Sequence, residues 1–85
     1  MLIRDKVVLV TGGAKRVGRC VALTLAQKGA SVVINYRKSE REAIEVVEEI
    51  SRFGVRAFAI KADVSDENDV KNMIGKIIDE FGTLH

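Results

Sequence analysis

The sequence has no proline, no tryptophan, one cysteine and one histidine among its 85 residues. A single thiol, Cys20, excludes an intramolecular disulfide and a metal site built from several cysteines. The single histidine, His85, leaves no histidine-rich metal site and little basis for a histidine-dependent catalytic triad. The sequence therefore predicts no metal ligands.

Long apolar runs are also missing. No stretch reaches the ~18 apolar residues that a membrane-spanning helix requires, and residues 1–6 carry charges without the apolar segment of a signal peptide. We therefore expect a cytoplasmic protein without a membrane partner. The 14 Lys and Arg residues exceed the 12 Asp and Glu residues by a net charge of +2, which is too small to indicate nucleic-acid binding.

The remaining composition is that of a globular chain, with 47% hydrophobic and 31% charged residues. Apolar β-branched runs alternate with segments of helical periodicity. Strands are expected at residues 7–10, 31–35 and 55–60, and helices at residues 16–28, 39–53 and 65–81. Ser39 and Glu42 form a Ser-x-x-Glu capping box at the start of the second helix, and Ser65 is expected to cap the third.

Each expected helix has one apolar stripe that should face the core. The stripes are Val17, Cys20, Val21 and Leu25; then Ala43, Val46, Val47 and Ile50; then Val70, Met73, Ile74, Ile77, Ile78 and Phe81. Cys20 is accordingly predicted to be a small core residue and not a nucleophile.

The alternation predicts an α/β fold in which residues 1–85 form the first βαβαβα half of a doubly wound parallel sheet, left incomplete. The strand order of such sheets runs 3-2-1-4, so the strand at residues 7–10 would be an open edge. An exposed apolar edge favours association. We expect the chain to self-associate or to be completed by a further, C-terminal part.

The most informative segment joins the first strand to the first helix and reads Thr11-Gly12-Gly13-Ala14-Lys15-Arg16-Val17-Gly18. Glycines permit a tight turn and a close approach of the backbone to a ligand. The positive end of a helix dipole attracts anions. Together these features predict a pyrophosphate site, and the alternative is an ordinary glycine-rich turn.

The spacing differs from the Gly-x-Gly-x-x-Gly fingerprint and resembles the Thr-Gly-x-x-x-Gly-x-Gly signature of the short-chain dehydrogenase/reductase family. Arg16 replaces the middle glycine, which is similar to the variant found in pteridine reductases and in some 3-oxoacyl-[acyl-carrier-protein] reductase-like members. The resemblance covers the whole chain and implies a Rossmann fold. It also implies an oxidoreductase that transfers hydride to a carbonyl or pteridine-like substrate, with Asp63 at the adenine end of the cofactor and Val64 packed nearby.

The cofactor choice follows from the residues after the second strand. NAD-binding versions of this fold carry an acidic residue ~20 positions beyond the glycine loop, whereas no carboxylate lies between Ser31 and Ser39. Arg37 and Lys38 occupy that region, and an arginine fork suits a 2′-phosphate. The sequence predicts NADP(H), unless these two are only solvated loop charges. The candidate cofactor-binding residues are Gly12, Lys15, Arg16, Val17, Gly18, Tyr36, Arg37, Lys38, Asp63 and Val64.

No catalytic residue is predicted. The resemblance implies a catalytic tyrosine with a lysine four residues later, but Tyr36 is followed at that spacing by Glu40. Two interpretations remain: the cofactor-binding part of an NADP(H)-dependent reductase, inactive by itself, or a non-catalytic nucleotide-binding module that pairs with another chain. A methyltransferase is a weaker alternative, because it needs an acidic residue where Arg37 stands.

Overall fold

The computed structural model describes residues 6–12 and 15–82 of the chain. Strands and helices alternate as the periodicity predicts. The elements are β1 (Val7–Thr11), α1 (Arg16–Gln27), β2 (Ser31–Tyr36), α2 (Glu40–Ser51), β3 (Ala57–Lys61) and α3 (Glu67–Phe81). The third strand begins two residues later than expected, at Ala57 in place of Val55.

The three strands form one parallel sheet in the order β1-β2-β3, as in one half of a doubly wound Rossmann sheet. Val7 pairs with Ser31, and Val32 pairs with Ala57. β1 is therefore an edge strand of the described sheet, as the sequence predicts. In the part of the chain that the structure describes, no helix is long and apolar enough to cross a membrane.

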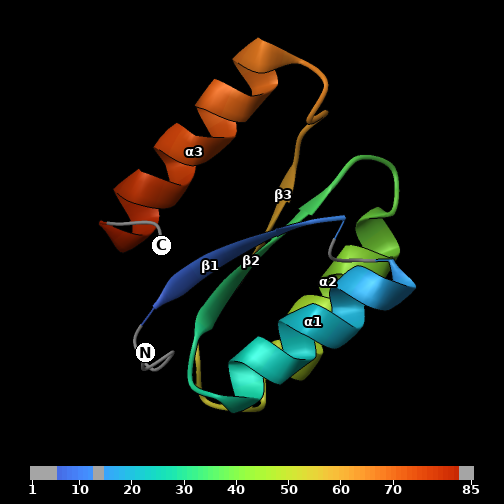
Figure 1. The fold of residues 1–85 in the computed structure, drawn as a ribbon, viewed down its shortest axis with the longest axis vertical. Helices are drawn as coiled ribbons and strands as arrows, with labels where there is room; N and C mark the ends of the chain where they lie inside the picture. The colour runs from blue at the N-terminus through green and yellow to red at the C-terminus, as the bar shows by residue number, and fades with distance from the viewer. Residues whose placement is uncertain (1–5, 13–14, 83–85) are drawn as a thin grey trace.

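Helices cover both faces of the sheet, with α1 and α2 on one side and α3 on the other (Figure 1). Successive residues of a strand point to opposite faces, so Val32 and Ile34 pack with α1 and α2. Val33 packs with Met73 and Ile77 of α3. The uninterrupted apolar run of β2 thus supplies both layers of core.

The turn after α1 shows why a glycine stands at position 29. Gly29 has φ +94°, a left-handed conformation that other residues rarely adopt. Its N–H donates to the Ala26 carbonyl, and the Ala30 N–H donates to the Leu25 carbonyl. This pair of bonds is a Schellman motif, and it turns the chain directly into β2.

The predicted buried stripe of α1 was wrong for three of its four residues, and only Leu25 packs against the core. Val17 is 75% exposed and Val21 is 45% exposed, and Cys20 is an exposed free thiol, not a core residue. Ala22 and Ala26 are buried instead, next to α2 and β2. Small side chains let α1 approach its neighbours closely, whereas the larger Val17 and Val21 face a side of the helix that no other described element covers.

The stripes of the other two helices are largely confirmed. Ala43, Val46 and Ile50 of α2 are buried, and Met73 and Ile77 of α3 are buried. The exception is Ile78, which is 46% exposed because it lies to one side of the α3 contact.

Both predicted helix caps need correction. Ser39 does occupy the N-cap position of α2, but its side chain makes no cap hydrogen bond, so the capping box is not formed. The cap of α3 is Asp66 and not Ser65: its Oδ1 accepts from the backbone N–H groups of Asn68 and Asp69. Ser65 is engaged elsewhere, on the side chain of Asp63.

Candidate functional site

A pocket of about 400 Å³ lies at the carboxyl ends of the three strands. This is the edge at which open α/β sheets bind their ligands, and the volume falls within the ~300–1,000 Å³ range of small-molecule sites. Each strand contributes the residues that follow it or end it. The lining residues are Gly12, Lys15, Asn35, Tyr36, Arg37, Lys38, Ser39, Ala62, Asp63, Val64 and Ser65.

The first strand contributes Gly12 and Lys15. Gly12 has φ +64°, so the turn out of β1 uses the conformational freedom of glycine. The Lys15 N–H donates to the Gly12 carbonyl at 3.0 Å, which closes this turn. Lys15 then serves as the N-cap residue of α1 without a side-chain cap bond. Gly13 and Ala14, which belong to the predicted loop, lie outside the described residues.

The start of α1 differs from the starts of the other described helices. Its first turn contains no acidic residue and no side-chain cap. The first turn of α2 contains Glu40 and Glu42, and α3 is capped by Asp66. Because the first N–H groups of a helix have no partner within it, the start of α1 offers uncompensated positive charge to an anion.

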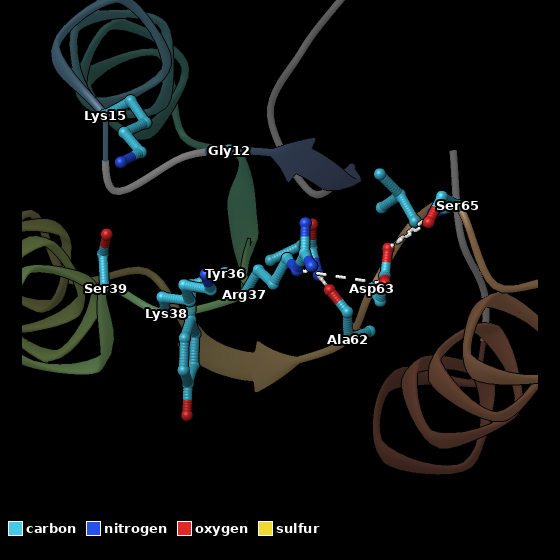
Figure 2. A pocket seen from close by; sticks show the side chains of 11 residues that line it. Gly12, Lys15, Tyr36, Arg37, Lys38, Ser39, Ala62, Asp63 and Ser65 are labelled. Carbon is cyan, nitrogen blue, oxygen red and sulfur yellow. Dashed lines mark hydrogen bonds and ion pairs between the residues drawn. The ribbon is translucent and has the colours of Figure 1, made fainter.

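The second strand contributes the cationic side of the pocket. Arg37 and Lys38 directly follow β2, and both are exposed. Figure 2 shows Lys15, Lys38 and Ser39 on one side of the pocket, with Arg37 extending from β2 across it. The segment that follows β2, from Arg37 to Ser39, contains no carboxylate. The cationic lining residues of the pocket are Lys15, Arg37 and Lys38.

Tyr36 is the last residue of β2, one residue beyond the strand expected at residues 31–35. It is half-buried and packs against the hydrophobic core on the side of α1 and α2. It also lines the pocket, so its position is set by the core while part of it reaches the site.

The third strand contributes the acidic side. Asp63 Oδ1 accepts from the Ser65 hydroxyl at 2.6 Å and from the Ser65 N–H at 2.9 Å. Its N–H donates to Asp69 Oδ2 at 3.0 Å, and its Oδ2 lies 3.9 Å from Arg37 Nε. The Ser65 hydrogen bonds, first from the side chain and then from the backbone, lower the pKa of Asp63, and the nearby Arg37 charge adds to this. Asp63 is therefore an anion at neutral pH.

Asn35 holds the second and third strand ends together. It is the one buried polar residue among those described, at 3% exposure. Its side-chain amide donates to the carbonyls of Ala62 at 3.1 Å and Ile60 at 3.5 Å. The Ala62 N–H donates in turn to the Tyr36 carbonyl at 2.9 Å. Asn35 thereby fixes the segment that carries Asp63 next to the segment that carries Arg37.

Seven of the ten predicted residues meet around this pocket: Gly12, Lys15, Tyr36, Arg37, Lys38, Asp63 and Val64. Three others, Arg16, Val17 and Gly18, lie in the first turn of α1 and do not line it. Sequence reasoning missed the other four lining residues, which are Asn35, Ser39, Ala62 and Ser65. A polar residue ending the apolar run of β2 was a usable signal for Asn35, but Ser39 was assigned to helix capping.

The geometry can be compared with known proteins. A profile described as short chain dehydrogenase matches residues 6–85. The "Short-chain dehydrogenase/reductase homolog YusS" of Bacillus subtilis is 45% identical over 84 residues, which are 99% of this chain and 77% of that protein. The "3-oxoacyl-[acyl-carrier-protein] reductase FabG" of Staphylococcus aureus is 47% identical over 79 residues, 93% of this chain but 32% of that protein.

Solved structures agree on the fold. A short chain dehydrogenase from Burkholderia cenocepacia in complex with NADP superimposes with a TM-score of 0.93 at 40% identity, over 99% of this chain and 34% of that one. An NAD+-bound xylitol dehydrogenase gives a TM-score of 0.91 at 25% identity, over 99% of this chain and 32% of that one. The chain thus spans about a third of the length of these structures.

Proposed function

Because the chain belongs to the short-chain dehydrogenase/reductase family, we propose that residues 1–85 are the NADP(H)-binding part of an oxidoreductase. The reaction is hydride transfer between the cofactor and a carbonyl or pteridine-like substrate. The observation that carries the proposal is the set of cationic side chains of Lys15, Arg37 and Lys38 around one pocket at the carboxyl end of the sheet. A FabG reductase among the relatives supports the carbonyl substrate.

The cofactor's pyrophosphate is proposed to lie at the start of α1. Gly12 allows the backbone to approach it, and the first turn, from Arg16 through Val17 to Gly18, presents N–H groups without an acidic neighbour. This assigns a role to the three predicted residues that do not line the pocket itself. They contact the chain of phosphates by their backbone and not by their side chains.

The adenine is proposed to lie against Val64 and Asp63. Val64 is 55% exposed at the pocket, which gives an apolar ring a surface to cover. The Asp63 carboxylate can accept a hydrogen bond from the exocyclic amino group of adenine. The adenosine ribose then lies near Tyr36 at the end of β2.

A phosphate on the 2′-oxygen of that ribose is proposed to contact Arg37, Lys38 and Lys15. A dianionic phosphate suits the arginine fork and the two ammonium groups. Ser39 adds a hydroxyl that is not engaged in capping. An NAD-type site would need a carboxylate after the second strand to hold the free 2′-hydroxyl, and Arg37 and Lys38 occupy that region.

Calorimetric titration of the chain with NADPH and with NADH tests the proposal. Charged hydrogen bonds contribute ~1.5–3 kcal/mol each, so we expect NADPH to bind roughly ten- to a hundredfold more tightly. Equal affinities for the two cofactors would contradict NADP(H) preference. No binding of either would contradict the cofactor site.

Catalysis is proposed to need residues outside these 85. The sequence contains no Tyr-x-x-x-Lys, the pair that the family resemblance implies for hydride transfer. The alternative function, a non-catalytic nucleotide-binding module, is favoured by the same observation. An assay of carbonyl-dependent NADPH oxidation is expected to give no turnover with the 85-residue chain, and measurable turnover would overturn this assignment.

The edge of the sheet is proposed as the place where the chain self-associates or receives a C-terminal part. β1 is the edge strand of the described sheet, and Val17 and Val21 of α1 are exposed. Unprotected strand edges beside apolar side chains promote pairing between chains. Sedimentation velocity at micromolar concentration is expected to show dimers or larger species, and a single monomer peak would contradict self-association.

A further inference from the structure

The turn from β3 into α3 engages three polar groups of Asp63. Its Oδ1 accepts from Ser65 (Figure 2), and its carbonyl accepts from the Asp66 N–H at 3.0 Å. Ser65 precedes α3 and Asp66 is the N-cap of that helix, so these two bonds shape the turn itself. The third group, the Asp63 N–H, donates at 3.0 Å to Oδ2 of Asp69, which lies inside α3. This bond ties the main chain of Asp63 to the helix.

The carboxylate of Asp69 is not used for helix capping. Asp69 is the third residue of α3, the position whose side chain accepts from the N-cap N–H in a capping box. Here the N-cap N–H, that of Asp66, is bonded to the Asp63 carbonyl instead. Asp66 Oδ1 accepts from the N–H groups of Asn68 and Asp69 and caps the helix alone. The Asp69 side chain is therefore free to reach back to Asp63.

Asp69 acts on the loop and not on a ligand in the pocket. It is half-buried, and it lines a neighbouring hollow of about 380 Å³ that also contains Lys61, whereas the pocket is lined by Asp63 and Val64. Because it holds the Asp63 N–H, Asp69 fixes the direction in which the Asp63 carboxylate and the following Val64 leave the main chain.

Resting on the proposed function, we propose that Asp69 is a positioning residue for adenine recognition, which holds Asp63 and Val64 towards the adenine. Asn35 bonds the carbonyl of the preceding residue, Ala62, so the segment is fixed from β2 as well as from α3. The role requires a hydrogen-bond acceptor at position 69 and not a negative charge. A carboxylate that acted only on the dipole of α3 would instead require its charge.

Substitution separates the acceptor from the charge. Asp69→Asn keeps an oxygen acceptor and removes the charge, whereas Asp69→Ala removes both. Glu67→Ala is the matched control, because Glu67 is an exposed carboxylate of the same helical turn whose partner is Lys71 at 3.4 Å. Circular dichroism shows whether each variant folds before the variants are compared.

Hydrogen exchange followed by NMR without cofactor measures the bond itself. The Asp63 N–H should exchange slowly in the wild type, in Asp69→Asn and in Glu67→Ala. In Asp69→Ala it should exchange at least about tenfold faster, because its acceptor is gone. A role limited to the helix dipole would not produce this pattern.

Calorimetry measures the consequence for binding. Asp69→Ala should bind NADPH, NADH and adenosine 5′-monophosphate about three- to tenfold more weakly, by the same factor for each, because all three contain adenine. Arg37→Ala, in contrast, should change the ratio between NADPH and NADH. Asp69→Asn and Glu67→Ala should bind all three nucleotides within about twofold of the wild type.

Several outcomes would overturn the inference. If Asp69→Asn loses as much affinity as Asp69→Ala, the charge matters and the acceptor does not. Fast exchange of the Asp63 N–H in the wild type, or full affinity in a folded Asp69→Ala, also contradicts the inference, while NADPH binding by the wild type keeps the proposed function. If Asp69→Ala does not fold, the comparison of Asp69→Asn with the wild type still decides. No NADPH binding by the wild type overturns the proposed function, and the adenine role of Asp69 with it, even where the Asp63 N–H is protected.

Discussion

Arg37 and Asp63 face each other across the pocket, with the arginine Nε 3.9 Å from the carboxylate Oδ2 (Figure 2). The two residues follow different strands, β2 and β3, that are adjacent in the sheet. The pair therefore depends on the strand order and not on closeness in sequence. It places one cationic and one anionic group where the proposed nucleotide would lie.

Removing the guanidinium of Arg37 should lower the affinity for NADPH much more than the affinity for NADH. In Arg37→Ala, the affinity for NADPH is expected to fall roughly ten- to a hundredfold, because a charged hydrogen bond to phosphate is lost. The affinity for NADH should change by less than about threefold, because NADH has no 2′-phosphate. Titration of both cofactors into the variant measures this, and an equal loss for the two would place Arg37 elsewhere in the site.

Asp63 should give stability a dependence on pH. Its hydrogen bonds from Ser65, and secondarily the charge of Arg37, hold its pKa below the ordinary value. A carboxyl group with a lowered pKa in the folded state stabilises the fold above its unfolded pKa of ~4, and this contribution is lost as the pH falls further.

The matched comparison is the wild type against Asp63→Asn, with thermal unfolding followed between about pH 7 and pH 2.5. We expect the wild type to be the more stable at neutral pH and the difference to disappear at the acid end. Ser65→Ala removes the shortest hydrogen bond to Asp63. In that background, the stability difference at neutral pH between Asp63 and Asp63→Asn should be smaller. If wild type and Asp63→Asn differ in stability by the same amount at every pH, the titration of Asp63 does not contribute to stability and the prediction is wrong.

Asn35 should be required for both stability and binding. Asn35→Ala leaves the Ile60 and Ala62 carbonyls without their side-chain donor, and a buried group without a partner costs ~1–3 kcal/mol. Urea denaturation should show a loss of free energy of unfolding of that size. NADPH affinity should also fall, because the segment bearing Asp63 is no longer fixed. Unchanged affinity in a folded variant would show that β3 alone positions Asp63.

Much of the fold could be predicted because each of its signals is local. The apolar run at residues 31–35 predicts a strand from neighbouring residues alone, and β2 confirms it. Seven of the ten candidate residues meet at one pocket because the carboxyl ends of parallel strands share one edge of the sheet.

The predictions that were wrong required a choice between local sequence patterns that look alike. Helix α1 has two apolar faces, and the sequence offered no means to weigh Val17 and Val21 against Ala22 and Ala26. The sheet and α2 decide which face is buried, and they bury the small Ala22 and Ala26 completely. Asn35 was missed for a similar reason, since its partners are carbonyls 25 and 27 residues away.

The corrected helix caps give the last prediction, because Asp66 and Ser39 hold the same position on two helices with different hydrogen bonding. Asp66 accepts two backbone N–H bonds at the start of α3, so Asp66→Ala should lower the free energy of unfolding by ~1 kcal/mol. Ser39 makes no such bond, so Ser39→Ala should change that free energy by less than ~0.5 kcal/mol. The Ser39→Ala variant should instead bind NADPH more weakly, while its affinity for NADH stays unchanged. Chemical denaturation and calorimetry on the two variants measure both effects. A stability loss in Ser39→Ala equal to that in Asp66→Ala would mean that Ser39 caps α2 after all and that its hydroxyl is not available to the phosphate.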